Sequence, residues 1–205
     1  MRDDAPGAAA AESAAAAWSD FFLTFARAFA RPEGADWFAA MRDHLPEALG
    51  ELCAMLGVAG ADLIDAYRAE MAAVPDAEAL SVAYAGLFLT PPAPVPINTG
   101  LYLDGSVMGP SEVDLTLRYA AEGLGKAAGF RDLNDHVSAQ LDFAAWLYGR
   151  AAETGETAPA LAFLADYPDR WAPALAEALD AAGDRPAPWR PLAHLLVRAV
   201  DAALG

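Results

Sequence analysis

Apolar side chains recur at helical spacing along most of this chain. In residues 14–30, Phe21, Phe25 and Phe29 lie four residues apart, as do Trp18 and Phe22. This spacing places the rings on one face of a helix. No segment alternates apolar and polar residues between turn signals, as a half-buried strand would. The sequence therefore predicts an all-α fold.

Proline and glycine divide the chain into about eight to ten expected helices. Pro46 is expected to end its helix early or to kink it, and Asp62 and Ser111 are expected to cap helices. Gly123 and Gly125 fall inside a predicted helix. The expected helices cover residues 14–30, 36–49, 52–56, 62–73, 76–89, 110–128, from Asp132 or Asn134 to 152, 159–165, 170–182 and 188–204.

A long loop rich in proline and glycine, residues 90–109, separates the helices into two groups. Loops of this length within a compact domain are usually functional or disordered. This loop carries apolar residues, among them Ile97 and Val107, so we expect it to pack on the body and to be a possible hinge. A chain of 205 residues favours one domain. We expect that domain at residues 14–205, after a mobile, low-complexity tail at residues 1–13.

The balance of charge limits the classes of partner. The formal net charge is −16, from 13 Lys and Arg against 29 Asp and Glu. Such a charge repels nucleic acid and anionic membranes and attracts basic partners, although it also serves simple solubility. The start of the chain is acidic and lacks a continuous apolar run, which is unlike a secretory signal. The longest uncharged run, residues 79–103, is broken by prolines and is unsuited to spanning a membrane. We therefore expect a cytoplasmic protein without stable membrane insertion.

Residues that commonly carry catalysis or bind metals are sparse. The lone cysteine, Cys53, excludes an internal disulfide and fits a reducing compartment. It offers no close metal-ligand spacing with His44, His136 or His194. No glycine-rich phosphate loop follows a strand, and the common nucleophile signatures are absent. The sequence thus predicts no enzyme activity, no catalytic residue, no metal site and no cofactor.

Two segments stand out on either side of the long loop. Before it, Tyr84, Leu87 and Phe88 share one helix face. This arrangement is typical of plain core, and for Leu87 that interpretation is favoured. Pro91 and Pro92 then hold the chain extended, because a residue before proline avoids helical geometry.

After the loop, Asp135 and His136 lie at an expected helix start. A carboxylate beside an imidazole can orient it and raise its pKa. Taken alone, the pair is more typical of a cap and a histidine at the edge of the core. His136, Gln140 and Phe143 share one helix face. A stiff apolar loop beside this polar helix start predicts a groove for an extended or helical peptide.

In these segments the chain resembles the TorD/DmsD/NarJ family of redox-enzyme maturation chaperones. The resemblance covers residues 80–176, and it rests on the order and spacing of several motifs. The matching residues are Tyr84, Leu87, Phe88, Pro91 and Pro92, the stretches 101–105 and 108–111, the group Asp135, His136, Leu141 and Phe143, and Phe163, Leu164, Trp171, Ala172 and Pro173.

The resemblance implies an all-helical cytoplasmic chaperone. Its partner would be an apo molybdenum or tungsten oxidoreductase subunit with a twin-arginine signal peptide, held until the molybdopterin cofactor is inserted. The implied oligomeric states are a monomer or a domain-swapped homodimer. Residues expected to line or support the peptide site are Tyr84, Leu87, Phe88, Pro91, Pro92, Tyr102, Gly109, Asp135, His136 and Gln140.

Two alternatives stay open. One is a NarJ-like assembly chaperone that binds a mature client subunit without a leader. The other is a helical protein that binds a small molecule or a nucleotide. The chain departs from the family pattern at Thr90, at residues 95–99 and at Gln140. We expect these positions to select the client.

Overall fold

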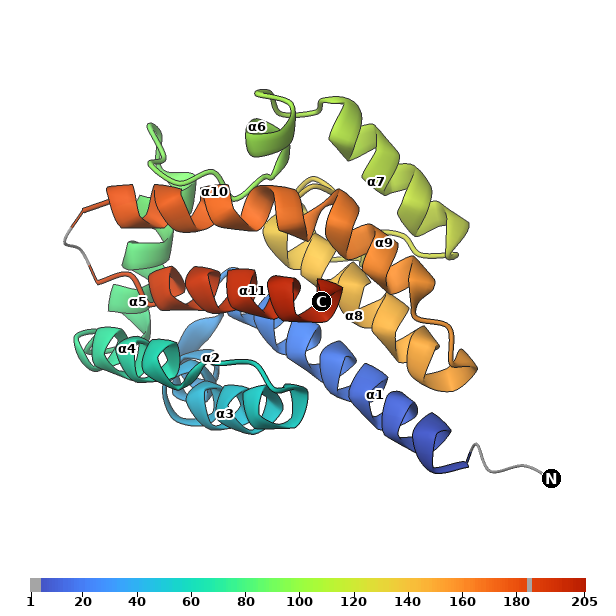
Figure 1. Cartoon of the computed structure of the whole chain (residues 1–205). Helices are drawn as coiled ribbons and strands as arrows, with labels where there is room; N and C mark the ends of the chain where they lie inside the picture. The colour runs from blue at the N-terminus through green and yellow to red at the C-terminus, as the bar shows by residue number, and fades with distance from the viewer. Residues whose placement is uncertain (1–4, 184–185) are drawn as a thin grey trace.

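The computed structural model describes residues 5–183 and 186–205, and that part of the chain is all-helical (Figure 1). An isolated antiparallel bridge joins Asn98 and His136. The elements are α1 (Ala5–Ala28), α2 (Gly34–Ala39), the π-helical turn η1 (Ala40–His44), α3 (Leu45–Leu56), α4 (Ala61–Ala72), α5 (Ala77–Tyr84), the π-helical turn η2 (Ala85–Leu89), α6 (Gly100–Leu103), α7 (Pro110–Ala121), α8 (Val137–Thr154), α9 (Ala158–Asp166), α10 (Pro168–Ala181) and α11 (Trp189–Leu204).

The helices before and after the long loop share one core. α1 packs along α8 and against α3, while α11 packs against both α10 and α4 (Figure 1). One continuous cluster of buried apolar residues runs from Phe21 on α1 through Leu80 and Leu141 to Trp189 on α11. The all-α prediction is therefore confirmed. Segments 97–99 and 135–137 are bonded to each other, so the loop packs on the body as expected.

Several helix boundaries follow from local chemistry. Asp76 caps α5, because its carboxylate accepts a hydrogen bond from the Ala79 amide at 2.8 Å. Gly57 ends α3 in the left-handed conformation, which glycine adopts without strain. Pro46 lies in the first turn of α3, where its missing N–H leaves no bond unmade. The first alternative predicted for Pro46, an early helix end, was therefore wrong: η1 leads directly into α3, and residues 34–56 are helical throughout. The second alternative, a kink, stays a prediction.

Other boundaries differ from the sequence prediction. α1 begins at Ala5, so helix extends into the tail expected at residues 1–13. The physical reason is that this region is mostly alanine, the strongest helix former. Residues 1–4 of that tail lie outside the described residues. α7 ends at Ala121 and not at 128, because Gly123 turns left-handed at φ 73°. Gly123 and Gly125 therefore follow the helix instead of lying within it.

The capping residues also differ at three helix starts. α8 is capped by His136, not by Asp132 or Asn134. At α7, the carboxylate of Asp104 accepts from the amide of Ser111 at 2.9 Å and from its hydroxyl at 2.6 Å. At α4, Gly60 precedes the helix and the carboxylate of Asp62 pairs instead with Arg198 at 2.6 Å. Only the Asp62–Arg198 pair joins residues far apart in the chain; His136 and Asp104 act on residues two and seven positions later.

No single helix among the described residues has both the length and the apolarity to cross a membrane. The pair Ala61–Ala72 and Ala77–Leu89 passes that test only when joined, and it is bent by 112°.

Candidate functional site

The start of α8 holds the long loop in place through Asp135. The Asp135 side chain is fully buried. One carboxylate oxygen accepts from Asn98 Nδ2 at 2.8 Å and the other accepts from the Gly100 amide at 3.0 Å. Backbone bonds flank this contact, from Thr99 N to Asp135 O at 2.9 Å and from Val137 N to Ile97 O at 3.0 Å. Residues 97–100 are thereby fastened to the helix start.

Gln140 extends this network to a third element. Its amide nitrogen donates to the hydroxyl of Thr99 and to the Asp135 carbonyl, the latter at 3.0 Å. Its carbonyl oxygen accepts from Trp171 Nε1 on α10 at 2.9 Å. Gln140, Thr99 and Trp171 are all fully buried. One side chain therefore joins the loop, α8 and α10 with its polar atoms satisfied, as burial requires.

His136 faces its own helix and not Asp135. Its Nδ1 accepts from the Ser138 amide at 3.1 Å and lies 2.7 Å from the Ser138 hydroxyl. The ring of Phe130 meets the imidazole edge to face, with the ring centroids 5.9 Å apart. Burial lowers the pKa of His136, although nearby carboxylates oppose the shift. A neutral imidazole suits this position, because its lone pair caps the helix.

The aromatic motif before the loop lies in the core. Tyr84, Leu87 and Phe88 are all buried. The Tyr84 hydroxyl donates to the Phe29 carbonyl at 3.1 Å. The rings of Tyr84 and Phe88 pack against Trp189, at centroid distances of 5.3 Å and 5.6 Å. The favoured core interpretation of Leu87 agrees with this burial.

The ten residues predicted for a peptide site thus divide into two sets. The structure brings both segments to the same loop, but six side chains face inward: Tyr84, Leu87, Phe88, Asp135, His136 and Gln140. In this conformation those six support the loop and cannot touch a partner directly. The other four reach the surface in whole or in part: Pro91 and Pro92 are exposed, and Tyr102 and Gly109 are half-buried. Their role in binding a peptide stays a prediction.

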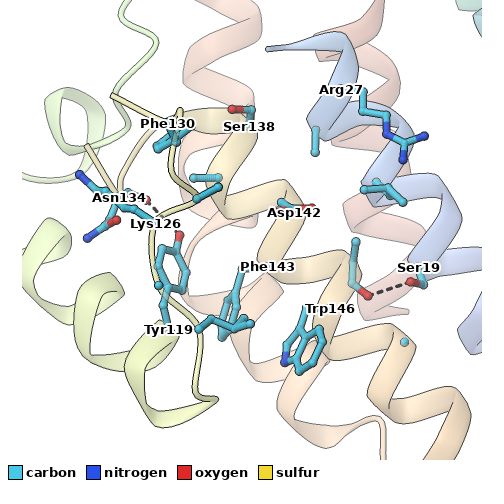
Figure 2. Close-up of a pocket in the computed structure, with 18 of the residues that line it drawn as sticks. Ser19, Arg27, Tyr119, Lys126, Phe130, Asn134, Ser138, Asp142, Phe143 and Trp146 are labelled. Carbon is cyan, nitrogen blue, oxygen red and sulfur yellow. Dashed lines mark hydrogen bonds between the residues drawn. The ribbon is translucent and has the colours of Figure 1, made fainter. Parts of the chain in front are cut away.

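A separate groove of about 750 Å³ lies along the outer side of α8 (Figure 2). We call it the α8 groove. One wall is α1, with Leu23 and Ala26, and the other is the segment from Tyr119 to Asn134, with Phe130. The floor is α8, where Trp146 is 41% exposed. None of the ten predicted residues lines this groove. The ring of His136 packs against Phe130, which does line it.

The floor of the α8 groove suits a long, thin occupant. Its lining runs from Ser138 to Glu153 on α8, which is four helical turns or about 22 Å. Ala139 and Gly149 are small and half-buried, whereas Ala145 is buried against α1, where the Ser19 hydroxyl donates to its carbonyl at 2.8 Å.

Two of the five charged residues that line the groove have partners within the described part of the chain. Arg150 pairs with Glu122 at 2.8 Å, and Lys126 Nζ donates to the Asp132 carbonyl at 2.7 Å. Asp142, on the floor, has no hydrogen bond or ion pair with the described residues (Figure 2). Burial raises the pKa of Asp142, with a smaller opposing effect from Arg27. The groove therefore offers the carboxylates of Asp142 and Glu153, with Arg27 on the α1 wall, within a mostly apolar surface.

The groove residues were missed at the sequence level for an identifiable reason. The sequence argument followed the face of α8 that carries His136 and Gln140, which proved to be the buried face. Asp142 and Trp146, one turn apart, mark an adjoining face about 120° round the helix, with Phe143 between the two faces. The glycines after α7 were the available signal that the wall opposite α1 is irregular and not helical.

No group of three or more His, Cys, Asp or Glu within the described part of the chain is placed to hold a metal ion.

Comparison with known proteins places this architecture in a family. The family model "Nitrate reductase delta subunit" matches residues 38–177. A solved structure from Archaeoglobus fulgidus, described as a candidate redox enzyme maturation protein, has the same fold at a TM-score of 0.59. It is 19% identical, and the alignment covers 89% of this chain and 93% of that chain. No curated protein matches the chain. Because the family model spans more than half of its residues, the chain belongs to the nitrate reductase delta subunit family, the NarJ- and TorD-like redox-enzyme maturation chaperones.

Proposed function

We propose that this protein is a cytoplasmic chaperone for a molybdopterin oxidoreductase. It holds the apo form of the client subunit until the cofactor is inserted, and it performs no chemistry itself. The client segment that it holds is an apolar helix, supplied by a twin-arginine leader or by the mature chain. Family membership supports the general role, and the α8 groove supports the binding mode.

The observation that carries the proposal is the shape and lining of the α8 groove. An open channel four turns long, with small residues on its floor and apolar residues on both walls, matches the known mode in which a helix lies in a groove. Trp146 is the natural anchor, because an exposed tryptophan buries a large area when a partner covers it.

Charge adds selectivity to this apolar contact. Asp142 can accept a basic side chain of the client, because it has no hydrogen bond or ion pair with the described residues; Arg150 and Lys126 are engaged elsewhere, and Arg27 acts on Asp142 only at longer range. A twin-arginine leader combines two basic residues with an apolar segment, so it matches both parts of the groove. The net charge of −16 lies mostly outside the groove and would raise the rate of association with a basic peptide. Added salt should weaken binding, because it screens exposed charges.

Calorimetry with two ligands tests the proposal and separates its two forms. The ligands are the leader peptide of a candidate client oxidoreductase and the same client subunit without its leader. Binding of the leader alone assigns the groove to the leader, and binding of the leaderless subunit assigns it to the mature client. Failure of both to bind would refute the function.

A matched pair of variants locates the contact. Trp146→Ala should weaken client binding by about tenfold or more, because buried tryptophan anchors dominate interface energetics. Met55→Ala is the control: Met55 is 64% exposed and lies on α3, outside the groove. If both variants bind as the wild type does, the client lies elsewhere and the groove argument is wrong.

A further inference from the structure

Helix α7 buries Leu115 in the core but leaves an apolar face exposed on its outer side. Its charged residues, Glu112, Asp114 and Arg118, are half-buried and lie beside that face. Its exposed residues are all uncharged: Pro110, Val113, Thr116, Leu117, Ala120 and Ala121. A helix that packs on a protein normally buries its apolar stripe and exposes its charges.

The inner face of α7 is fastened by polar bonds. The carboxylate of Asp114 accepts from Arg118 Nε at 2.7 Å and from the hydroxyl of Tyr167. Arg118 also reaches Asp166 on α9 at 2.8 Å. Tyr119 donates to the Asn134 carbonyl at 3.0 Å. These contacts fix which side of α7 faces outward, so the apolar exposure is built into the fold.

The outer face forms a continuous apolar stripe. Val113 and Leu117 lie one turn apart, and they are 56% and 64% exposed. Ala120 and Ala121 continue the same face by helical spacing. Met108, 72% exposed, holds a left-handed conformation at φ 61° just before the helix. Figure 1 shows α7 at the edge of the molecule, away from α1 and α3.

We propose that this outer face of α7 is a second docking surface, which binds an apolar helix of another protein edged by lysine or arginine. The charge of the rim selects that occupant: Glu112 and Asp114 flank the stripe on its two sides, and the exposed Asp104 precedes the helix. Arg118 is already held by two carboxylates. A second copy of this chain would set acidic rims against each other without a free cation on α7 to pair with them, so it is disfavoured.

This surface is distinct from the α8 groove, because none of the exposed α7 residues lines that groove. The inference therefore does not rest on the proposed function. A chaperone with both surfaces could hold two segments of one partner, which would raise the overall affinity through effective concentration.

The test uses a synthetic helical peptide with a leucine face and lysines along both edges, followed by fluorescence anisotropy. Measurements are made in the Trp146→Ala background, so that the α8 groove does not contribute. The α7 double variant, Val113→Thr with Leu117→Gln, should bind the peptide about tenfold or more weakly than its parent. The matched control replaces two other exposed apolar residues, Met55→Gln and Val82→Thr, and should bind as its parent does. A second peptide with glutamates in place of the lysines should bind more weakly at low salt.

Three results would overturn the inference. The first is equal binding by the parent and the α7 double variant, and the second is equal binding of the lysine-edged and glutamate-edged peptides. The third is self-association in sedimentation that the α7 double variant abolishes, since it would assign the face to a second copy. Circular dichroism of the double variant confirms that α7 is retained, because both substitutions are at exposed positions.

Discussion

Replacing Asp135 with alanine should cause one of the largest stability losses available at a polar position. The side chain is fully buried, and each of its oxygens accepts one hydrogen bond, from Asn98 Nδ2 and from the Gly100 amide. A hydrogen bond to a charged group contributes about 1.5–3 kcal/mol, and the loss leaves a buried donor without a partner. We therefore expect Asp135→Ala to lower the free energy of unfolding by about 3 kcal/mol or more.

Urea denaturation measures this loss by linear extrapolation. Asp132→Ala is the matched control, because Asp132 is an exposed aspartate three residues away in the same segment. Its effect should lie within about 0.5 kcal/mol of zero, as for ordinary surface substitutions. Because the network fastens a loop onto an intact core, the main transition should remain cooperative.

A double-mutant cycle separates the carboxylate contact from general disturbance. Asn98→Ala removes one of the two donors to Asp135 and should cost less than Asp135→Ala. Combining the two changes should give a coupling energy of about 1 kcal/mol or more, since residues in one network are not additive. The reasoning is refuted if Asp135→Ala costs less than about 1 kcal/mol, or if the two effects simply add.

Three further predictions concern the same helix and loop. Gly100→Ala should lower the free energy of unfolding by about 1–3 kcal/mol in chemical denaturation, because the new methyl would lie 2.7 Å from an Asp135 oxygen; Gly129→Ala, with open space around it, is the control. Burial holds the pKa of His136 below 6.5, so the unfolded chain binds this proton first; stability should therefore fall as pH drops below 6.5, and His136→Gln should flatten this dependence in denaturation curves at several pH values. Asp142→Asn should leave the melting temperature at pH 7 unchanged or slightly higher, because burial disfavours its charge, yet it should weaken binding of a basic leader in calorimetry. A lowered melting temperature would show instead that the Asp142 carboxylate stabilises the fold.

The helices were predictable from sequence because their apolar spacing and their glycine signals are local. Phe21 and Phe25 lie on one buried face of α1, and Phe29, directly after the helix, is buried with them, as their spacing predicts. Some of the boundaries that failed depend on contacts outside the helix itself. Asp104 caps α7 from a loop seven residues earlier, and Asp62 is drawn to Arg198 on the last helix. No pattern along the chain encodes such pairs.

The candidate site was less predictable than the fold, because a motif does not reveal which way its side chains face. Asp135, His136 and Gln140 were chosen as polar residues at a helix start, and they do meet the loop. Their partners, Asn98 and Trp171, lie 37 and 31 residues away, so only the folded chain shows that the network is internal. The apolar surfaces around Trp146 and Leu117 arise because neighbouring segments leave those helix faces uncovered.

The two faces of α8 separate stability from recognition. The face of Gln140 is closed by the loop and α10, with its polar atoms satisfied, so a substitution there changes folding first. The face of Asp142 and Trp146 is open, and Asp142 has no hydrogen bond or ion pair within the described part of the chain, so we expect a substitution there to change client binding with little effect on folding. The departures from the family pattern at Thr90 and at residues 95–99 lie on the loop that the closed face anchors. A sequence change in the loop that alters the choice of client would act by moving the loop. A change at Asp142 would act by direct contact with the client. Exchanging the loop residues while leaving Asp142 intact would therefore change client choice only if the loop itself meets the client.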